Sequence, residues 1–474
     1  MTTLKNIELL TQDDLKKYVH FDKKISLKLA NELVAEREFV CKYRFYPFML
    51  YKQEWTSFRK NHNLNKKVRP IRYAARLDAY IFTTYRKKLA EKYESLLSEH
   101  DLHNSVLAYR RVLTNSGKGK NNIHFAKEAF DKIDELDSCL VIALDIASFF
   151  ENLSHKKIKE MWCRLLNVRS LPDDHYTVYK NITRYHYVDR NEVYKRLGCL
   201  EENEGRLKRT AKSFPLSGQL CDEYEFREKV CGRGLEESLI LSNDGKRGVP
   251  QGAALSDLIA NFYLFDFDLN IKEFIAKKGG SYMRYSDDIL ILLPSSSEDC
   301  TLLLNETEAM VQTLLNEFGD AALTIKDEKV EVVYFSSSSF KWIKGKKATN
   351  GIEYLGFRYD GKKAYIRNST ISRLYRKVSS AVKVAVLQHV EKYPEQNESE
   401  LKASFDYDNF FQSFLRKRFE YLDFNNPRTW NFYSYLKKAK KIMEYKGVQI
   451  PKQIYGVSKF IQKRVDFEVS RRKT

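Results

Sequence analysis

Three aspartates that follow apolar stretches place the strongest constraint on the fold of this chain. Asp145 ends the apolar run CLVIALD, and Asp287 and Asp288 lie between the segments YMRYS and ILILLP. A short apolar run bounded by turn residues is typical of a buried strand. We therefore expect a buried strand that ends at Asp145 and a strand–turn–strand unit whose turn carries the other two. A carboxylate beside a buried strand is costly unless something neutralises its charge.

These three carboxylates form a candidate site for divalent cations. An adjacent pair of aspartates and a third aspartate on a neighbouring strand offer the hard oxygen ligands that Mg²⁺ prefers, and bound Mg²⁺ shares its shell with phosphates. Two such ions about 4 Å apart stabilise the attacking and leaving oxygens of a phosphoryl transfer. The alternative is an ordinary turn, because aspartate is common in turns. On the segment YSDD alone, the ordinary turn is the better interpretation.

The order of the expected elements predicts an α+β fold. A strand, a helix, a strand–turn–strand, a second helix and a final strand follow one another from residue 136 onward, which is the order of a split βαβ layer. We expect an antiparallel sheet with helices packed on one face. Around this layer we expect a mainly helical region at 1–60, a helix near 78–98, a mostly helical polar insertion at 153–245, and a helical basic region from about 370 onward.

The charge of the chain favours a polyanionic partner. Among 474 residues, 82 Lys and Arg stand against 63 Asp and Glu, so the formal net charge is +19. Nucleic acid fits this charge better than a membrane, because no apolar run reaches the ~18 residues of a spanning helix. A merely basic surface is the alternative. The seven cysteines form no CxxC pair and the first residues carry no apolar signal core. We therefore expect a reduced, cytoplasmic protein without a zinc finger or a disulfide framework.

Three further segments favour a nucleotide site near the carboxylates. Gln251 and Gly252 in GVPQG precede a helix, where glycine lets the backbone approach a ligand and the helix N-terminus favours anions. Arg69 and Arg72 in VRPIR offer forked donors for a triphosphate. Phe150, in the aromatic pair after the first aspartate, could form an apolar wall against a sugar ring. Each segment alone has an ordinary structural explanation, but their joint occurrence in this order is hard to attribute to chance.

This series of segments resembles the reverse transcriptases, specifically the bacterial lineage that includes group II intron, retron and abortive-infection enzymes. YSDD at 285–288 is similar to the family's YxDD box, and LDIASFFENLSH at 144–155 is similar to its first palm motif, with Glu151 in place of the usual aspartate. Further similar segments are VPQGAALSDLIANFYL, LTIKDEKVEVV, IEYLGFRY and VLAYRRVLTNSGKGKNNIHFAKEAF. The resemblance covers about residues 65–360.

The resemblance implies a right-hand polymerase. Fingers and a split βαβ (ferredoxin-like) palm would occupy residues 61–364 and contain the helical insertion at 156–246. Residues 1–60 would form a helical N-terminal extension, and residues 365–474 a helical, basic, thumb-like domain. The implied reaction is RNA-directed DNA synthesis from dNTPs with two Mg²⁺ ions, for which Mn²⁺ can substitute. Implied partners are an RNA template or noncoding RNA and the DNA product, with a homo-oligomer as an option and no membrane.

The resemblance also implies roles for individual residues. The catalytic, metal-binding carboxylates would be Asp145, Asp287 and Asp288. The nucleotide-binding residues would be Arg69, Arg72, Phe150, Gln251, Gly252 and Tyr285, with the Phe150 ring as the gate that rejects a ribose 2′-hydroxyl. The residues at the primer and template would be Lys329 (or Lys326 in the same segment), Tyr354 and Gly356.

The flanking regions favour one branch of this family. The long insertion and the helical, basic C-terminal region resemble those of abortive-infection and related defence-associated enzymes, which act in antiphage immunity, some with a partner noncoding RNA. A retron or group II intron enzyme is the alternative, although we find neither a VTG tripeptide nor a Cys/His nuclease module after the motifs. Template-independent DNA synthesis by the same site and a non-catalytic RNA-binding scaffold also stay open.

Overall fold

A computed structural model shows how these segments are arranged. It describes residues 9–58, 64–203, 206–210, 218–234, 237–320, 322–337, 339–345, 350–415 and 431–473. Helices and strands are both abundant, so the expected α+β class is confirmed. No helix within these ranges is long and apolar enough to cross a membrane.

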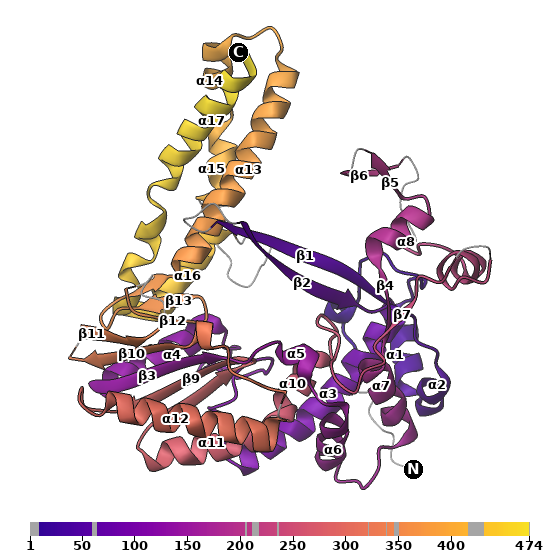
Figure 1. Cartoon of the computed structure of the whole chain (residues 1–474). Helices are drawn as coiled ribbons and strands as arrows, with labels where there is room; N and C mark the ends of the chain where they lie inside the picture. The colour runs from indigo at the N-terminus through magenta and orange to yellow at the C-terminus, as the bar shows by residue number, and fades with distance from the viewer. Residues whose placement is uncertain are drawn as a thin grey trace.

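A five-stranded antiparallel sheet, which we call the central sheet, lies at the lower left of the molecule in Figure 1. Its strands lie in the order β11-β10-β3-β9-β8. The strand and helix order of a split βαβ layer is confirmed, because β10, β3, β9 and β8 lie side by side as that motif requires. The bounds are β3 (Ser138–Asp145), α10 (Ser256–Tyr263), α11 (Phe265–Lys277), β8 (Ser281–Tyr285), β9 (Asp288–Pro294), α12 (Cys300–Leu314), β10 (Glu331–Ser336) and β11 (Ser339–Lys344).

Both faces of this sheet are covered. Leu140 and Ile142 of β3 pack into one buried cluster with residues of α10, α11 and α12, whereas Cys139 and Val141 pack into a second cluster with α4 (Asn122–Glu135). Figure 1 shows α11 and α12 below the sheet and α4 above it. The expectation of helices on one face is therefore wrong. The uninterrupted apolar run of β3 already reflects burial on both sides, since a half-exposed strand would alternate apolar and polar residues.

The N-terminal region contains helices and a long hairpin. Helices α1 (Leu27–Ala35) and α2 (Arg37–Lys42) match the expected helical character, and α3 (Arg76–Glu99) matches the helix expected near 78–98. However, β1 (Phe48–Phe58) pairs with β2 (Leu64–Tyr73) in an antiparallel hairpin. The expectation of a mainly helical segment up to residue 60 is wrong for this last part. A domain boundary at residue 60 would cut the hairpin in two.

The polar insertion is helical in part and also extends a sheet. Its helices are α6 (His155–Leu166), α7 (Asp173–Thr183) and α8 (Arg190–Arg196). Its strands β4 (His186–Asp189) and β7 (Leu241–Ser242) join the hairpin in a sheet with the order β2-β1-β4-β7, and β4 is parallel to β1. A separate hairpin consists of β5 (Leu200–Asn203) and β6 (Arg206–Arg209). The strands within the insertion were not expected, and they tie it to the N-terminal hairpin.

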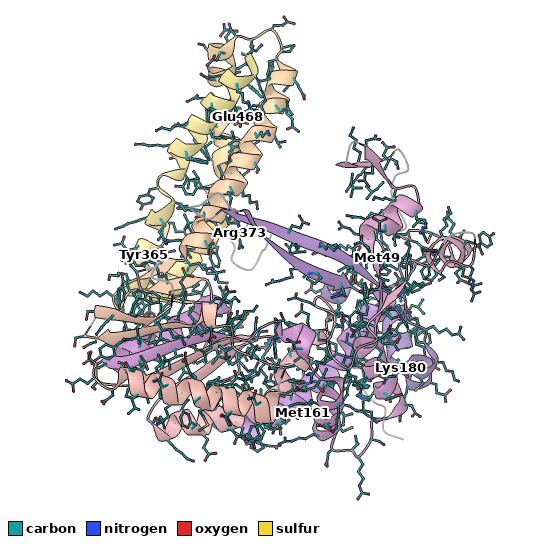
Figure 2. All side chains as sticks on the ribbon, in the orientation of Figure 1. Met49, Met161, Lys180, Tyr365, Arg373 and Glu468 are labelled. Carbon is teal, nitrogen blue, oxygen red and sulfur yellow. The ribbon has the colours of Figure 1, made fainter. Side chains whose placement is uncertain are left out.

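The C-terminal region begins with a small sheet and continues as helices. The sheet consists of β12 (Ile352–Tyr354), β13 (Phe357–Tyr359) and β14 (Ala364–Ile366). The helices are α13 (Asn368–Lys392), α14 (Glu398–Ser404), α15 (Tyr407–Phe414), α16 (Phe432–Met443) and α17 (Val457–Lys473). Helices α13 and α17 rise together from the central sheet (Figure 1). Between them Glu468 is fully buried, and Arg464 and Arg472 pair with it (Figure 2).

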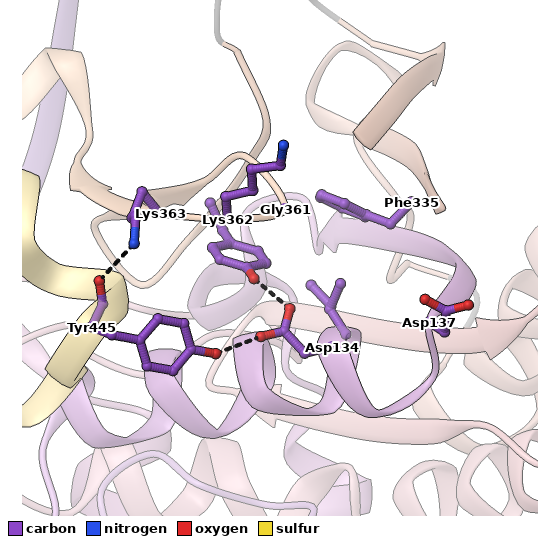
Figure 3. A pocket seen from close by; sticks show the side chains of 9 residues that line it. Asp134, Asp137, Phe335, Gly361, Lys362, Lys363 and Tyr445 are labelled. Atoms are coloured by element: carbon purple, nitrogen blue, oxygen red, sulfur yellow. Dashed lines mark hydrogen bonds between the residues drawn. The ribbon is translucent and has the colours of Figure 1, made fainter. Parts of the chain in front are cut away.

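A polar cluster fixes this helical region to the central sheet (Figure 3). Asp134 of α4 accepts hydrogen bonds from the hydroxyl groups of Tyr359 and Tyr445, the latter at 3.1 Å. The ammonium of Lys446, only 3% exposed, lies 2.8 Å from the same carboxylate. Lys363 donates to the Tyr445 carbonyl at 3.1 Å. These contacts line a cavity of about 330 Å³ and join α4, β13 and the segment after α16.

Candidate active site

Strand pairing brings the three aspartates to one end of the central sheet. Asp145 is the last residue of β3 and lies opposite Asp288, the first residue of β9. Asp287 precedes it in the turn after β8, where Ser286 adopts a left-handed φ of +63°. The amide of Ile146 donates to the Asp287 carbonyl at 3.2 Å, which fixes the turn against the end of β3. A non-glycine residue at such a φ is strained and occurs often at functional sites.

The carboxylates repel one another in this position. Burial raises the pKa of Asp287, and the charge of Asp145 raises it further. Burial and the charges of Asp287 and Asp145 raise the pKa of Asp288 to about 7, although its side chain lies at the rim of the site and reaches solvent. Atom Oδ1 of Asp145 is buried without a hydrogen-bond partner. Excess negative charge of this kind marks a site that a cation would stabilise.

A lysine from a distant segment partly neutralises the site. The chain at 324–326 pairs with the residues after β3: the Lys326 amide donates to the Asp145 carbonyl at 3.1 Å, and the Ala147 amide donates to the Thr324 carbonyl at 2.8 Å. This pairing brings the Lys329 ammonium into contact with Oδ2 of Asp145. Of the two lysines that the sequence left open, Lys329 is therefore the one whose ammonium reaches the carboxylates.

The donor set fits a divalent metal ion. The oxygens of Asp145, Asp287 and Asp288 are hard ligands of the type that Mg²⁺ prefers, and Oδ1 of Asp145 is buried without a hydrogen-bond partner. In the part of the chain that the structure describes, no three His, Cys, Asp or Glu side chains are already gathered around a metal position. The Lys329 ammonium pairs with Oδ2 of Asp145, the other oxygen of that carboxylate.

The segment around Gln251 contacts strand β2. The Arg72 amide donates to the Gln251 carbonyl at 2.8 Å, and a Cβ on Gly252, whose φ is +114°, would lie 2.8 Å from the Arg72 carbonyl. Only glycine fits at this position, and the group that its backbone closely approaches is strand β2, whereas the sequence suggested a ligand. The Val249 amide donates to the Phe150 carbonyl at 3.0 Å. Arg72, Gln251, Gly252 and Phe150 thus belong to one connected group.

Arg69 does not join this group. It lies on β2 opposite Gln53, in the same regular register that places Arg72 opposite Leu50. Side chains alternate between the two faces of a strand, so residues three apart point to opposite faces. The two arginines that the sequence suggested as joint phosphate ligands therefore leave β2 on opposite sides, and Arg72 is the one near Gln251.

Two tyrosines of the insertion, Tyr185 and Tyr187, flank Arg72 and were not among the predicted site residues. The Arg72 guanidinium carbon lies 5.4 Å from the ring centre of Tyr185 and 4.9 Å from that of Tyr187. The residues come together because β4 pairs with β1, which in turn pairs with β2. The alternation Tyr-His-Tyr at 185–187 is the only local sequence signal for a strand here, and it does not indicate with which strand this segment pairs.

A pocket of about 320 Å³ adjoins Asp288. Four predicted residues line it, namely Tyr285, Asp288, Tyr354 and Gly356. The Tyr354 hydroxyl is buried without a hydrogen-bond partner, and burial followed by the charge of Asp288 raises its pKa. Asn122, Glu353 and Arg367 also line the pocket and were not foreseen. The pocket thus places two of the predicted primer residues, Tyr354 and Gly356, beside Asp288.

Comparisons with known proteins identify one matching family model. The family model for "Reverse transcriptase (RNA-dependent DNA polymerase)" matches residues 234–359, which include Asp287 and Asp288 but end short of Asp145 and Arg72 on the N-terminal side. No curated protein matches the sequence.

Among solved structures, apo telomerase from Candida tropicalis is similar at 12% identity and a TM-score of 0.39, with 91% of this chain and 63% of that chain covered. Telomerase from Candida albicans, in complex with a TWJ fragment of telomeric RNA, gives 12% identity and a TM-score of 0.36, with 95% and 67% covered. A C. tropicalis telomerase that lacks its C-terminal domain has 58% of its length covered. Residues 234–359 thus match the reverse transcriptase domain, the domain found in RNA-directed DNA polymerases, which are nucleotidyltransferases.

Proposed function

We propose that the chain is a reverse transcriptase whose active centre comprises Asp145, Asp287 and Asp288. The pairing of Asp145 with Asp288 carries the proposal, because it adds a third carboxylate from outside the matched domain to the aspartate pair inside it. The central sheet is then the palm, the β1–β2 hairpin with its neighbouring helices forms the fingers, and α13 to α17 form the thumb. The fingers and palm begin at the hairpin, which starts before residue 60.

The proposed reaction joins a primer to an incoming dNTP. The primer 3′-hydroxyl attacks the α-phosphorus, its proton is lost, the bond to the β-phosphate breaks, and pyrophosphate leaves. Divalent metal ions, Mg²⁺ or Mn²⁺, supply charge neutralisation at the phosphates and a lowered pKa of the hydroxyl when bound to the three carboxylates.

The residues of the chain act mainly by position and charge. Arg72 offers two forked donors to the triphosphate, and Gln251 and Gly252 hold the strand that carries it. The half-buried Phe150 ring would form an apolar wall beside the sugar of the nucleotide. Tyr354 and Gly356 line the pocket beside Asp288, where the primer end would lie. Preorganised charge of this kind accounts for much of the rate enhancement in phosphoryl transfer.

The nucleic acid is held by its backbone in this proposal. A net charge of +19 favours contacts with phosphates, so binding should weaken as salt rises. We infer that the template is an RNA, with a partner noncoding RNA and a role in antiphage defence as the setting. The support for that setting is the sequence resemblance of the long insertion and the basic C-terminal helices to defence-associated enzymes.

Sequencing of the DNA made by the purified chain tests the proposal. Wild type and Asp287→Ala/Asp288→Ala are compared with Mg²⁺, dNTPs and a defined RNA template, a defined DNA template, or none. Glu298→Ala, an exposed acidic residue beyond the other end of β9, is the control. We expect template-copied DNA from wild type and the control and none from the double variant. DNA without a template would indicate terminal transfer. No DNA from wild type, with RNA bound equally by all three proteins, would establish a scaffold.

A further inference from the structure

The insertion places two tyrosine rings against Arg72, and the proposed reaction assigns these rings no role. Strand β4 runs parallel to β1, with Phe48 opposite Tyr187. This pairing places two tyrosine rings against the Arg72 guanidinium, at 5.4 Å and 4.9 Å from Tyr185 and Tyr187. The backbone of the same arginine is fixed to the Gln251 segment through its amide. Backbone and side chain are thus held by different parts of the chain.

The guanidinium keeps its charge uncompensated in this arrangement. Among the described residues no carboxylate forms an ion pair with Arg72, and its Nε is buried without a hydrogen-bond partner. A cation over an aromatic face is attracted by the ring without giving up its N–H donors. A carboxylate in the same place would occupy the donor fork that a phosphate needs. The rings can therefore orient the arginine and leave it ready for an anion.

The rings themselves are anchored. Tyr185 is 6% exposed and packs edge-on against Phe48 at 5.7 Å, and its ring centre lies 6.0 Å from that of Tyr187. Burial raises the pKa of the Tyr185 hydroxyl, so the phenol stays neutral and does not repel an anion. Two aromatic residues with few rotatable bonds form a stiff support for a long, flexible side chain.

We propose that Tyr185 and Tyr187 are positioning residues that hold Arg72 for the triphosphate of the incoming nucleotide. The insertion at 156–246 is then a wall of the nucleotide site as well as a peripheral addition. This inference rests on the proposed polymerase function for its substrate, and on the geometry of the three side chains for the clamp itself.

The test measures dNTP dependence and anion binding on the full chain. The variants are Tyr187→Leu, Tyr187→Phe, Tyr185→Phe and Arg72→Gln. Tyr51→Leu is the matched control, because Tyr51 lies next to Leu50 on β1 and its ring contacts Arg190 instead of Arg72. Thermal unfolding of each protein shows that it is folded. Primer extension gives KM and kcat for the dNTP, and calorimetric titration with inorganic tripolyphosphate gives anion affinity without any polymerisation.

We expect Tyr187→Leu to raise the KM for dNTP about tenfold with little change in kcat, and to weaken tripolyphosphate binding by a similar factor. The phenylalanine variants keep the ring and should resemble wild type, as should Tyr51→Leu. Arg72→Gln should lose at least as much as Tyr187→Leu. Equal KM and equal anion affinity for wild type and Tyr187→Leu would overturn the clamp. If wild type makes no DNA, the proposed polymerase function fails, and the tripolyphosphate titration still decides whether the clamp exists.

Discussion

Two groups of charged residues meet at the β8–β9 hairpin, and the chain compensates their charges to very different degrees. Arg284 on β8 and Asp268 on α11 are both fully buried and meet in a bidentate ion pair, with Nε–Oδ1 and Nη2–Oδ2 distances of 2.6 and 2.5 Å. The Tyr282 hydroxyl donates to the same carboxylate at 2.6 Å. Burial alone would lower the pKa of Arg284, but the charge of Asp268 more than offsets this and raises it. This pair has all the partners that a structural role requires.

The three aspartates at the end of the sheet are compensated only in part, by Lys329. Asp287 and Asp288 both have raised pKa values, and Asp145 retains a buried oxygen without a partner. Arg284 links the groups, because its Nη1 donates to the Ser286 carbonyl at 3.1 Å and so supports the turn that carries Asp287. The chain thus satisfies the charges of the buried Arg284–Asp268 pair, whereas the aspartates of the proposed metal site are only partly satisfied.

The sharpest test of this contrast is removal of one charge from the aspartate group. Asp287→Asn should lower the rate of DNA synthesis by about 10³-fold or more, because it removes a ligand of the proposed metal site. The same change should leave the free energy of unfolding unchanged or higher, since it relieves repulsion with Asp145. Primer extension and urea unfolding check the two expectations. Loss of stability along with activity would place Asp287 with the structural charges.

The opposite result is expected for the buried ion pair. Arg284→Met leaves Asp268 buried without its partner and should lower the free energy of unfolding by about 3–5 kcal/mol. Urea unfolding measures this loss. The double variant Arg284→Met/Asp268→Asn is the control, because it removes both charges and should recover much of the stability. A single variant as stable as wild type would show that the pair does not hold the fold.

The pH dependence of metal binding extends the comparison to the intact protein. Folding raises the pKa of Asp287, and it raises that of Asp288 from 3.8 to about 7. In the metal-free protein these two groups therefore contribute most to stability at low pH, where both are protonated, and the contribution of Asp288 is lost as the pH rises from about 4 through about 7. Mg²⁺ needs the ionised carboxylates, so its affinity should fall as the pH drops below about 7. Calorimetric titration of Mg²⁺ across this range checks the direction.

The control for this experiment is Asp288→Asn, which should flatten the pH dependence. The effect on stability itself should be small, because the Asp288 side chain reaches solvent and screening weakens the repulsion. An Mg²⁺ affinity that does not change with pH would show that these carboxylates are not the ligands.

The sequence predicted best what depends on neighbours in the chain. The strand ends at Asp145 and around Asp287 follow from short apolar runs, and strand pairing then places Asp145 opposite Asp288. The sequence did not predict contacts between residues that are far apart in the chain. The expectation of a mainly helical region at 1–60 misses β1 (Phe48–Phe58), because the aromatic residues of this strand carry no turn signal of their own. The contact of Tyr187 with Arg72 depends on a parallel pairing across more than a hundred residues.

A third charged cluster, around Asp134, is intermediate between the buried Arg284–Asp268 pair and the three aspartates. Its variants should change stability the least. Asp134 accepts hydrogen bonds from Tyr359 and Tyr445 and pairs with Lys446, so its charge is compensated, but the Tyr445 side chain is 59% exposed. Tyr445→Phe removes one hydrogen bond whose partners can turn to water, and should lower the free energy of unfolding by about 1 kcal/mol or less. Tyr359→Phe removes the buried counterpart and should cost more in the same urea unfolding experiment. If the two losses were equal, burial would not be what separates the structural charges from the rest, and the contrast between Asp268 and Asp287 would need another explanation.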